Sequence, residues 1–361
     1  MRISIVGPAW PLRGGIAHHV YWLRQQLLAR GHNVQVVSFR KLYPRIFFPG
    51  TTEYDVSRLR LDADALPILA PLNPLTWIRA FKRIKSFSPD AIVFQWWQPF
   101  FAPVVGTLVR AFRKSRLKCV IECHNVFPHE GTPLDRLLLA FALSPADHLI
   151  THSAKDREEL SAILPDRSVS VSPLPVLKEF YSNNNPDRSG RNILFFGKVR
   201  KYKGLDVLLA AMPEVLSRID CNLTVVGEFY DSIENYRRLV SEHGIERSVH
   251  IENRYVPNEE VPGIFERADV LVLPYRSATQ SAVARIALSN GLPVIASRTG
   301  GLSEAVIENV NGLLCPPADP QALADQIVAY FTAGLGPIFA KNILASNSSA
   351  CTIVEIIEQA A

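Results

Sequence analysis

Short apolar segments rich in Ile and Val alternate with helical segments along the whole chain, and this alternation restricts the fold more than any other feature. The segment 192–196 is one example, and it is too short to be a buried helix. Parallel strands have this composition because helices cover both faces of their sheet. Strands that alternate with helices predict βαβ units, so we expect an α/β fold with parallel sheets.

The alternation occurs in two halves of the chain. We expect strands near 2–7, 33–39, 90–95, 118–123, 147–151 and 168–172, and again near 192–196, 222–226, 248–252, 269–273, 293–296 and 312–315. The segment 182–190, which is polar and contains Pro and Gly, predicts a hinge between two doubly wound domains. The predicted boundaries are 1–177 for the amino-terminal domain, 178–190 for the hinge, 191–335 for the carboxy-terminal domain, and 336–361 for a tail whose final helix returns toward the first domain.

The net charge of +5 is unevenly distributed. Residues 1–185 contain 23 Lys and Arg against 14 Asp and Glu, whereas residues 186–361 contain 16 against 20. A basic half favours an anionic partner, either a phosphate-bearing acceptor or an acidic membrane surface, although a solvated basic face has the same composition. We expect no nucleic-acid partner, because no nucleic-acid-binding module is recognised.

The five scattered cysteines form no Cys-x-x-Cys pair, so we expect reduced thiols and a cytoplasmic protein. No apolar run approaches the ~18 residues of a membrane span. Peripheral contact with the inner face of a membrane stays open, because the segment 77–85 combines apolar and basic residues at helical spacing. An ordinary amphipathic domain helix has the same pattern.

A phosphate-binding loop is predicted where the strand 192–196 ends. Gly197 and Lys198 follow this strand, and Lys203 and Gly204 precede a predicted helix. Ammonium groups, a glycine that permits close approach of the backbone, and the positive end of a helix dipole all favour phosphate. The alternative is that both lysines are solvated loop residues.

Other motifs are weak singly but follow a specific order along the chain. They are Gly14-Gly15-Ile16, Cys123-His124-Asn125, Gly197-Lys198, Lys203-Gly204, Val226-Gly227, the run from Ala268 to Pro274, the run from Gly291 to Ala296, Gly300-Gly301 with Glu304, and the run from Asn311 to Leu314. In this order and spacing the chain resembles the family 4 retaining glycosyltransferases over most of its length. The resemblance implies the GT-B fold, in which two Rossmann-like domains face each other across a cleft.

The same resemblance implies transfer of a hexose from a nucleotide diphosphate sugar, UDP- or GDP-linked, to a glycan or lipid-linked acceptor. The expected setting is cell-envelope or exopolysaccharide biosynthesis. Because Lys198 and Lys203 can stabilise the leaving diphosphate, we expect neither a metal nor another cofactor. The resemblance also implies that the leaving phosphate helps to deprotonate the acceptor, so we expect no enzymic nucleophile. Asp62 and Asp64 imitate a metal-binding pair, but they lie in a predicted loop.

One feature of the family is missing. The family carries two glutamates eight positions apart, and counting back from Gly291 these positions are Ala278 and Ile286. The absence of both carboxylates leaves two alternatives open, a nucleotide-sugar-binding protein without catalysis and a nucleotide-sugar epimerase of the same fold.

The segment that replaces the first glutamate opens a predicted helix. The side chains of Gln280 and Ser281, with the backbone N–H groups of Ser281, Ala282 and Val283, can bind a diphosphate at this helix start. The alternative is that Ser281 only caps the helix.

The predicted catalytic residues are Lys198 and Lys203, which stabilise the leaving diphosphate, and His124, which the family places near the donor sugar. A histidine at a strand end is also often structural. We expect further donor contacts from Gly14, Gly15, Gly197, Gly227, Glu228, Arg254 and Tyr255.

The predicted acceptor-binding residues are Trp96, Trp97 and His129. Aromatic faces at a strand end suit stacking on sugar rings or packing on lipid chains. The alternative is that both tryptophans belong to the core.

Overall fold

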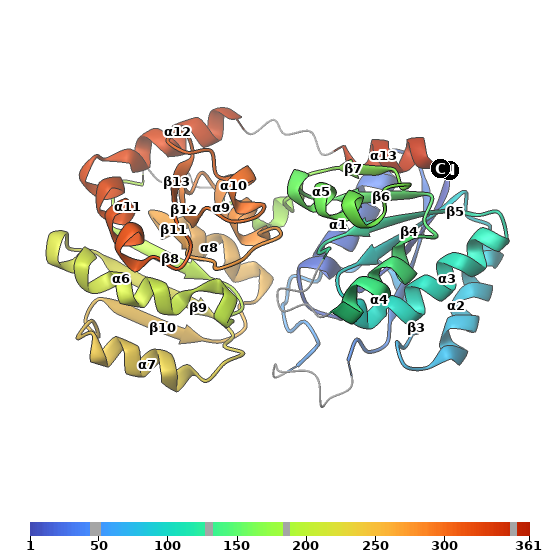
Figure 1. The fold of residues 1–361 in the computed structure, drawn as a ribbon, viewed down its shortest axis with the longest axis horizontal. Helices are drawn as coiled ribbons and strands as arrows, with labels where there is room; N and C mark the ends of the chain where they lie inside the picture. Colours follow the sequence, from blue (N-terminus) through green and yellow to red (C-terminus); the bar gives the residue numbers. More distant parts are fainter. Residues whose placement is uncertain (44–51, 127–132, 183–187, 347–351) are drawn as a thin grey trace. The chain divides into compact units, whose positions relative to one another are not determined.

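The computed structural model describes residues 1–361 except 44–51, 127–132, 183–187 and 347–351, and it contains two α/β units (Figure 1). The first unit comprises Met1–Val56, Arg60–Leu177 and Ala350–Ala361, and the second comprises Ser57–Leu59 and Lys178–Ser349. Each unit contains one sheet whose strands all pair in parallel. The prediction of two doubly wound α/β domains is therefore confirmed.

The sheet of the first unit has the order β3-β2-β1-β4-β5-β6-β7. Its strands are β1 (Arg2–Val6), β2 (Asn33–Phe39), β3 (Ala65–Leu69), β4 (Ala91–Trp96), β5 (Lys118–Cys123), β6 (His148–Thr151) and β7 (Val169–Val171). The α-helices are α1 (Gly15–Ala29), α2 (Pro74–Phe87), α3 (Ala102–Lys114), α4 (Pro133–Leu143), α5 (Ala154–Ile163) and α13 (Ile353–Ala360), and η2 (Pro99–Phe101) is a 3-10 turn. This strand order brings the carboxyl ends of β1 and β4 together, which is where doubly wound folds bind ligands.

The sheet of the second unit has the order β10-β9-β8-β11-β12-β13. Its strands are β8 (Asn192–Phe196), β9 (Asn222–Gly227), β10 (Val249–Asn253), β11 (Val270–Leu273), β12 (Val294–Ser297) and β13 (Gly312–Cys315). Its α-helices are α6 (Leu205–Arg218), α7 (Ile233–Glu242), α8 (Val261–Glu266), α9 (Ala282–Ser289), α10 (Leu302–Ala305), α11 (Pro320–Thr332) and α12 (Leu335–Ser346). The 3-10 turns are η3 (Lys178–Phe180), η4 (Lys201–Lys203) and η5 (Asn258–Glu260).

Strand β3 was not predicted from the sequence. Pro67 lies inside it, and proline removes a hydrogen-bond donor from a ladder. The structure tolerates Pro67 because β3 is the edge strand and pairs only with β2. The helix α12 was also missed, since Gly334, Gly336 and Pro337 suggested a break. Gly334 does end α11 with a φ of 60°, but Pro337 falls in the first turn of α12, where its missing N–H is not needed.

Helix α13 packs against the first unit. Ile353, Val354 and Ile357 are buried in one core with residues of β1 and α1, and Arg30 of α1 pairs with Glu355 and Glu358. The carboxy-terminal helix therefore completes a layer over a sheet that begins at residue 2.

No helix of the described segments is by itself long and apolar enough to cross a bilayer. Helices α11 and α12 pass that test only as a pair, and the chain bends by 87° between them. The four described cysteines are buried and free (Cys119, Cys123, Cys221 and Cys315).

Candidate active site

The turn after β8 is built from two glycines. Gly197 has a φ of 103°, a conformation that side chains rarely adopt, and its N–H donates to the carbonyl of Val226 at 2.9 Å. A Cβ on Gly227, at the end of β9, would lie 1.8 Å from the carbonyl oxygen of Gly197. Both residues must therefore be glycine for the two strand ends to approach this closely.

Lys203 lies above this turn. The Cβ position of Gly197 is 3.3 Å from the Nζ atom of Lys203 and 3.4 Å from Cγ2 of Val283, in the first turn of α9. Gly204 follows Lys203 with a φ of 67°, and a Cβ there would meet the carbonyl oxygen of Pro274 at 2.0 Å. The glycines thus bring Lys203, the turn and the start of α9 together, as the sequence predicted for a phosphate site.

The ammonium group of Lys203 is buried, and it pairs with no carboxylate of the described residues. Lys203 is 8% exposed, and its Nζ lies 5.4 Å from the ring centroid of Tyr275. Burial lowers the pKa of Lys203, and the ionisable neighbours that act on it among the described residues are Tyr202 and Arg200. A buried cation without an anion is costly, so this geometry favours an anionic ligand.

Helix α9 begins at Ser281, which is buried and caps it. The Oγ atom of Ser281 accepts a hydrogen bond from the N–H of Ala284 at 3.2 Å. The capping alternative for Ser281 is therefore the observed one. The N–H groups of Ala282 and Val283, in the first turn, have no acceptor within the helix and remain suited to a phosphate.

Gln280 lies against the Gly300-Gly301 turn. A Cβ on Gly301 would meet Nε2 of Gln280 at 2.4 Å, and the N–H of Gly301 donates to the carbonyl of Thr279 at 2.9 Å. A Cβ on Gly300 would lie 1.6 Å from the carbonyl oxygen of Ala278. The double glycine therefore allows close packing against the loop that contains Ala278, Thr279 and Gln280.

Arg276 holds the lysine turn, and sequence reasoning missed it. Its guanidinium forms two bonds to the carboxylate of Asp206, at 2.7 and 2.8 Å, and one to the carbonyl of Lys201 at 3.1 Å. Its backbone N–H donates to the carbonyl of Tyr202 at 2.7 Å. The clamp joins η4 and the first turn of α6 to the loop after β11. The sequence contained one signal for this clamp. Asp206 is an acidic residue in the first turn of a helix that Gly204 caps.

The other predicted residues of the second unit differ in exposure. Lys198 is exposed, with Nζ 5.6 Å from the ring centroid of Tyr230. Glu228 is buried, and its carbonyl accepts a hydrogen bond from the N–H of Val199, the residue after Lys198, at 2.9 Å. The guanidinium of Arg254 pairs with Glu252 at 3.0 Å and with Glu260 at 2.7 Å, so two carboxylates already balance its charge.

Tyr255 follows Arg254 and is partly buried. It lies in the connection between β10 and η5, which follows the carboxyl end of a strand as the sequence predicted. Its contact with a nucleobase stays a prediction.

In the first unit, Gly14 and Gly15 face open space. Gly14 caps α1 with a φ of 120°, and a Cβ on either glycine would meet nothing within 4 Å. Open space at a helix start fits the predicted approach of a donor, which stays a prediction. His124 is 8% exposed, and both ring nitrogens have partners, Gln95 at 2.6 Å and His152 at 3.3 Å.

The predicted acceptor role of the two tryptophans needs correction. Trp96 is 0% exposed and Trp97 is 8% exposed. The indole of Trp97 packs on Phe101, with ring centroids 4.0 Å apart, and its Nε1 donates to the hydroxyl of Tyr43 at 3.1 Å. Both rings belong to the core because the end of β4 is covered by η2. His129 lies outside the described residues, and Asp64 pairs with Arg24 at 3.4 Å.

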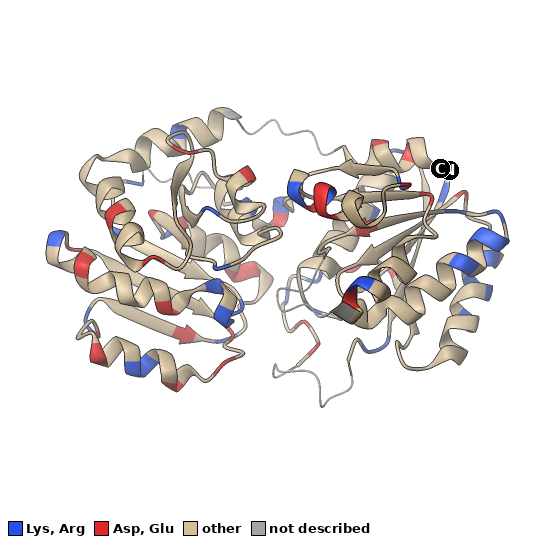
Figure 2. Ribbon diagram, viewed as in Figure 1, with Lys and Arg blue, Asp and Glu red and all other residues tan. Residues whose placement is uncertain are grey.

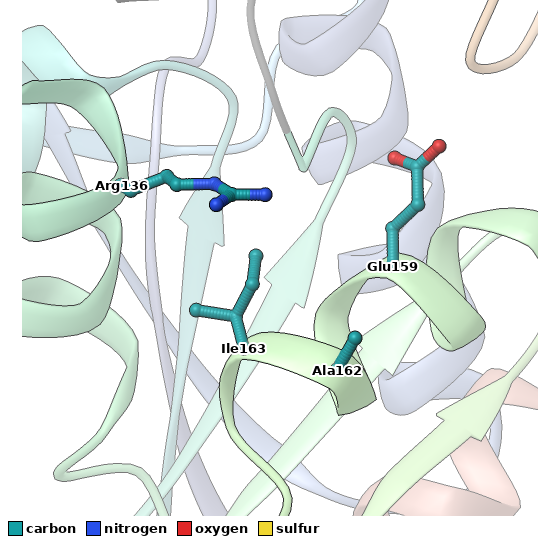
Figure 3. Close-up of a pocket in the computed structure, with 4 residues that line it drawn as sticks. All are labelled: Arg136, Glu159, Ala162 and Ile163. Atoms are coloured by element: carbon teal, nitrogen blue, oxygen red, sulfur yellow. The ribbon is translucent and has the colours of Figure 1, made fainter. Parts of the chain in front are cut away.

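A pocket of about 590 Å³ lies elsewhere in the first unit (Figure 3). Arg136 of α4 and Glu159, Ala162 and Ile163 of α5 line it. None of the predicted site residues is among them, so the glycine and lysine geometry, rather than this pocket, identifies the candidate site.

Two family models match the chain, one for each half. The model described as glycosyl transferase 4-like domain matches residues 14–175, and the one described as glycosyl transferases group 1 matches residues 190–332. An uncharacterised glycosyltransferase of Methanocaldococcus jannaschii is 24% identical over 90% of this chain and 87% of its own. A D-inositol 3-phosphate glycosyltransferase of Corynebacterium urealyticum is 35% identical, but over 38% of this chain and 34% of its own.

Solved structures show the same fold. Sucrose-phosphate synthase from Thermosynechococcus elongatus superposes with a TM-score of 0.77 at 19% identity, covering 99% of this chain and 96% of its own. HepE of Anabaena in complex with UDP gives a TM-score of 0.76 at 16% identity, covering 99% and 98%. These structures show that the fold is GT-B. The two family models, which together cover most of the chain, show that the protein is a nucleotide-sugar-dependent glycosyltransferase, with a glycosyl transferase 4-like domain followed by a group 1 domain.

Proposed function

We propose that the protein transfers a hexose from a UDP-sugar, with retention of configuration, to a glycan or lipid-linked acceptor of cell-envelope or exopolysaccharide biosynthesis. The observation that carries the donor site is the buried ammonium of Lys203, which has no carboxylate partner among the described residues and lies beside the Gly197 turn and Val283. UDP is proposed over GDP because the similar Anabaena protein was crystallised with UDP and with UDP-glucose.

In this proposal Lys203 and the N–H groups of Ala282 and Val283 bind the diphosphate. Negative charge grows on the diphosphate as the glycosidic bond breaks, and donors already held in place stabilise it without reorganisation. Lys198 adds a second cation from the exposed side of the turn, and His124 acts near the sugar. No metal is required in this scheme, because cations of the protein balance the leaving group.

Titration calorimetry with UDP tests the donor site. Lys203→Ala should raise the Kd for UDP by about ten- to a hundredfold, because a charge-assisted hydrogen bond contributes about 1.5–3 kcal/mol. Lys201→Ala is the matched control, since its side chain is exposed two positions away and it should leave the Kd unchanged. An equal loss in both variants would indicate general charge attraction, and tighter binding of GDP would replace UDP as the proposed nucleotide.

Turnover identifies the reaction. Wild-type protein should consume UDP-glucose or UDP-galactose only with an acceptor, and NMR of the product should show the anomeric configuration of the donor. Sugar interconversion without an acceptor would indicate the epimerase, and binding without turnover across a panel of donors and acceptors would contradict the proposed reaction.

We also propose that helices α2 and α4 contact an anionic membrane that carries the acceptor. Leu75 and Ile78 of α2 are 65% and 52% exposed, and Leu134 and Leu137 of α4 are 59% and 69% exposed. Ile84 of the same helix is 0% exposed, so α2 has both a buried face and an exposed apolar face. Figure 2 shows Lys and Arg along α2 and α3, and both α2 and α4 contact α3.

Vesicle sedimentation tests this contact. Wild-type protein should bind vesicles that contain phosphatidylglycerol and not vesicles of phosphatidylcholine alone. The double variant Leu75→Ser with Ile78→Ser should lose binding, whereas Leu28→Ser, an exposed leucine of α1, should retain it. Retained binding in the double variant would contradict the proposed surface.

A further inference from the structure

A carboxylate, an amide and three imidazoles are buried together at the carboxyl edge of the first sheet. His19 comes from α1, Gln95 from β4, Glu122 from β5, and His124 and His152 directly follow β5 and β6. Their exposed fractions are 3%, 1%, 0%, 8% and 1%. The roles predicted above use only His124, so the other four residues need an explanation.

The contacts form a connected network around Glu122. Its Oε1 lies 2.6 Å from Nε2 of His19 and 3.3 Å from Nε2 of His152, and its Oε2 accepts from Nε2 of Gln95 at 2.8 Å. Oε1 of Gln95 lies 2.6 Å from Nε2 of His124. Nε2 of His152 lies 3.3 Å from Nδ1 of His124. Glu122 therefore reaches both nitrogens of His124 through one intermediate residue each.

The acceptors in this network assign the protons. Because Gln95 donates its amide N–H to Glu122, its oxygen faces His124, and Nε2 of His124 must carry a proton. Nδ1 of His152 lies 2.8 Å from the carbonyl oxygen of Ser172, so it also carries a proton. One further proton must lie between His152 and His124, and it makes that pair cationic. The carboxylate of Glu122 balances this charge.

The pKa directions agree with this assignment. Burial alone would raise the pKa of Glu122, but the neighbouring imidazoles of His19, His124 and His152 bring it well below its usual range. Burial, aided by His152 and His19, lowers the pKa of His124 well below its usual value, against the attraction of Glu122. Both directions are consistent with a charged Glu122 and with a His124 imidazole that does not carry a second proton.

Backbone geometry also supports the network. A Cβ on Gly7, directly after β1, would lie 2.5 Å from Cγ of Gln95 and 2.9 Å from its Cβ. The side-chain methylene groups of Gln95 therefore occupy space that only a glycine at position 7 leaves open. This packing limits the directions in which Gln95 can turn.

We propose that Glu122 is a positioning residue for His124. Through Gln95 and His152, the carboxylate of Glu122 holds the His124 imidazole in one orientation, with the proton on Nε2. Without this carboxylate the amide of Gln95 can reverse, and His152 no longer needs its second proton. His124 then loses the constraint on both ring nitrogens. The inference rests on the proposed function, in which His124 acts in sugar transfer.

A metal ion fits the cluster less well than a proton. The ligand atoms of His19, Glu122 and His124 lie within 4.8 Å of one another, a spacing that could hold a cation. However, two ligands of a tetrahedral zinc with bonds of about 2.0–2.1 Å lie about 3.3 Å apart. The 2.6 Å between His19 and Glu122 is the distance of a protonated pair.

The test combines histidine NMR with kinetics of the full chain. In protein labelled with ¹⁵N-histidine, wild-type His124 should show the Nε2–H tautomer, and Glu122→Gln should change that tautomer. The same variant should lower kcat by about tenfold or more, as loss of a supporting partner does at other sites, with the Kd for UDP unchanged. Asp156→Asn removes another buried carboxylate of this unit and should leave the tautomer as it is.

Each result separates this inference from the proposed function. An Nδ1–H tautomer of wild-type His124, or a Glu122→Gln variant with unchanged tautomer and kcat, would overturn the positioning role. A loss of wild-type activity on treatment with a chelator would also overturn it, in favour of a metal. If wild-type protein transfers no sugar, the proposed function fails, while the tautomer still decides whether Glu122 orients His124.

Discussion

The clamp formed by Arg276 allows a quantitative test of how the lysine turn is held. Arg276→Met removes two bonds to Asp206 and one to the carbonyl of Lys201 but keeps an unbranched apolar chain in place of the arginine's aliphatic stem. The side chains of Arg276 and Asp206 are 33% and 37% exposed, so water screens the pair and each lost contact costs less than in a core. Together the three contacts contribute about 1–2 kcal/mol to the stability of the turn.

The clamp touches no ligand directly, so its effect on UDP must pass through Lys203. A loosened turn presents the ammonium for only part of the time, and the loss of affinity cannot exceed the contribution of Lys203 itself. We therefore expect Arg276→Met to raise the Kd for UDP by about three- to tenfold. In a Lys203→Ala background, Arg276→Met should change the Kd by less than about twofold.

Titration calorimetry on the four proteins of this double-mutant cycle measures the coupling. Arg218→Met is the matched control, because Arg218 lies at the other end of α6 and pairs with Asp325 at 2.7 Å. It should alter stability by a similar amount without changing UDP binding. Additive losses of affinity in the double variant, or an equal loss with Arg218→Met, would refute the idea that the clamp acts by placing Lys203.

Three further outcomes follow from the packing and charges. Gly204→Ala should lower the Tm by about 4 °C or more, because a left-handed backbone costs an alanine about 1–2 kcal/mol and its Cβ would meet Pro274. Gly263→Ala should leave the Tm unchanged, because a Cβ at position 263 would lie 3.7 Å from its nearest neighbour. Equal Tm values for the two variants would contradict the close approach at Gly204. Trp96→Ala should cost about 3–5 kcal/mol of unfolding free energy in denaturant melts while active protein keeps its KM for acceptor, and a raised KM at unchanged stability would restore the acceptor role. The free energy of unfolding should fall as the pH drops below about 6.5, because the unfolded chain binds a proton at His124 that the folded chain excludes. The fall should reach up to about 1.4 kcal/mol per pH unit. Urea melts at pH 7, 6 and 5 should show this slope, and the slope should be smaller in His124→Gln.

Periodicity and strand composition predicted most of the fold, because parallel strands buried on both faces are nearly continuous apolar runs. The failures occur where local signals conflict with tertiary context. Pro67 weakened the strand signal of β3, yet an edge strand tolerates it. Pro337 suggested a break, yet it occupies the first turn of α12. The sequence shows both prolines, but only the fold shows that Pro67 lies in an edge strand and that Pro337 lies at the start of a helix.

The candidate site was predictable where backbone geometry determines it. Gly197, Gly204 and Gly227 each occupy a position that excludes a side chain, and Lys203 lies where they converge. Side-chain partners were not predictable. The clamp between Arg276 and Asp206 joins residues 70 positions apart, and no periodicity encodes such a pair. The same holds for Trp97, whose position after a strand gave no sign that Phe101 of η2 packs on it.

Charge balance distinguishes the two groups of polar residues that the sheets bring together. The carboxylate of Glu122 already has partners within the network, since His19 and His152 lie 2.6 and 3.3 Å from its Oε1, so it needs no ligand to offset its burial. Lys203 has the opposite condition, because burial desolvates its ammonium and no described carboxylate compensates it. An incomplete site gains free energy when an anion binds, whereas a complete one gains nothing and can only orient what it contacts. This difference supports the proposal that the donor diphosphate binds at Lys203 and that the Glu122 network acts on the reaction through His124.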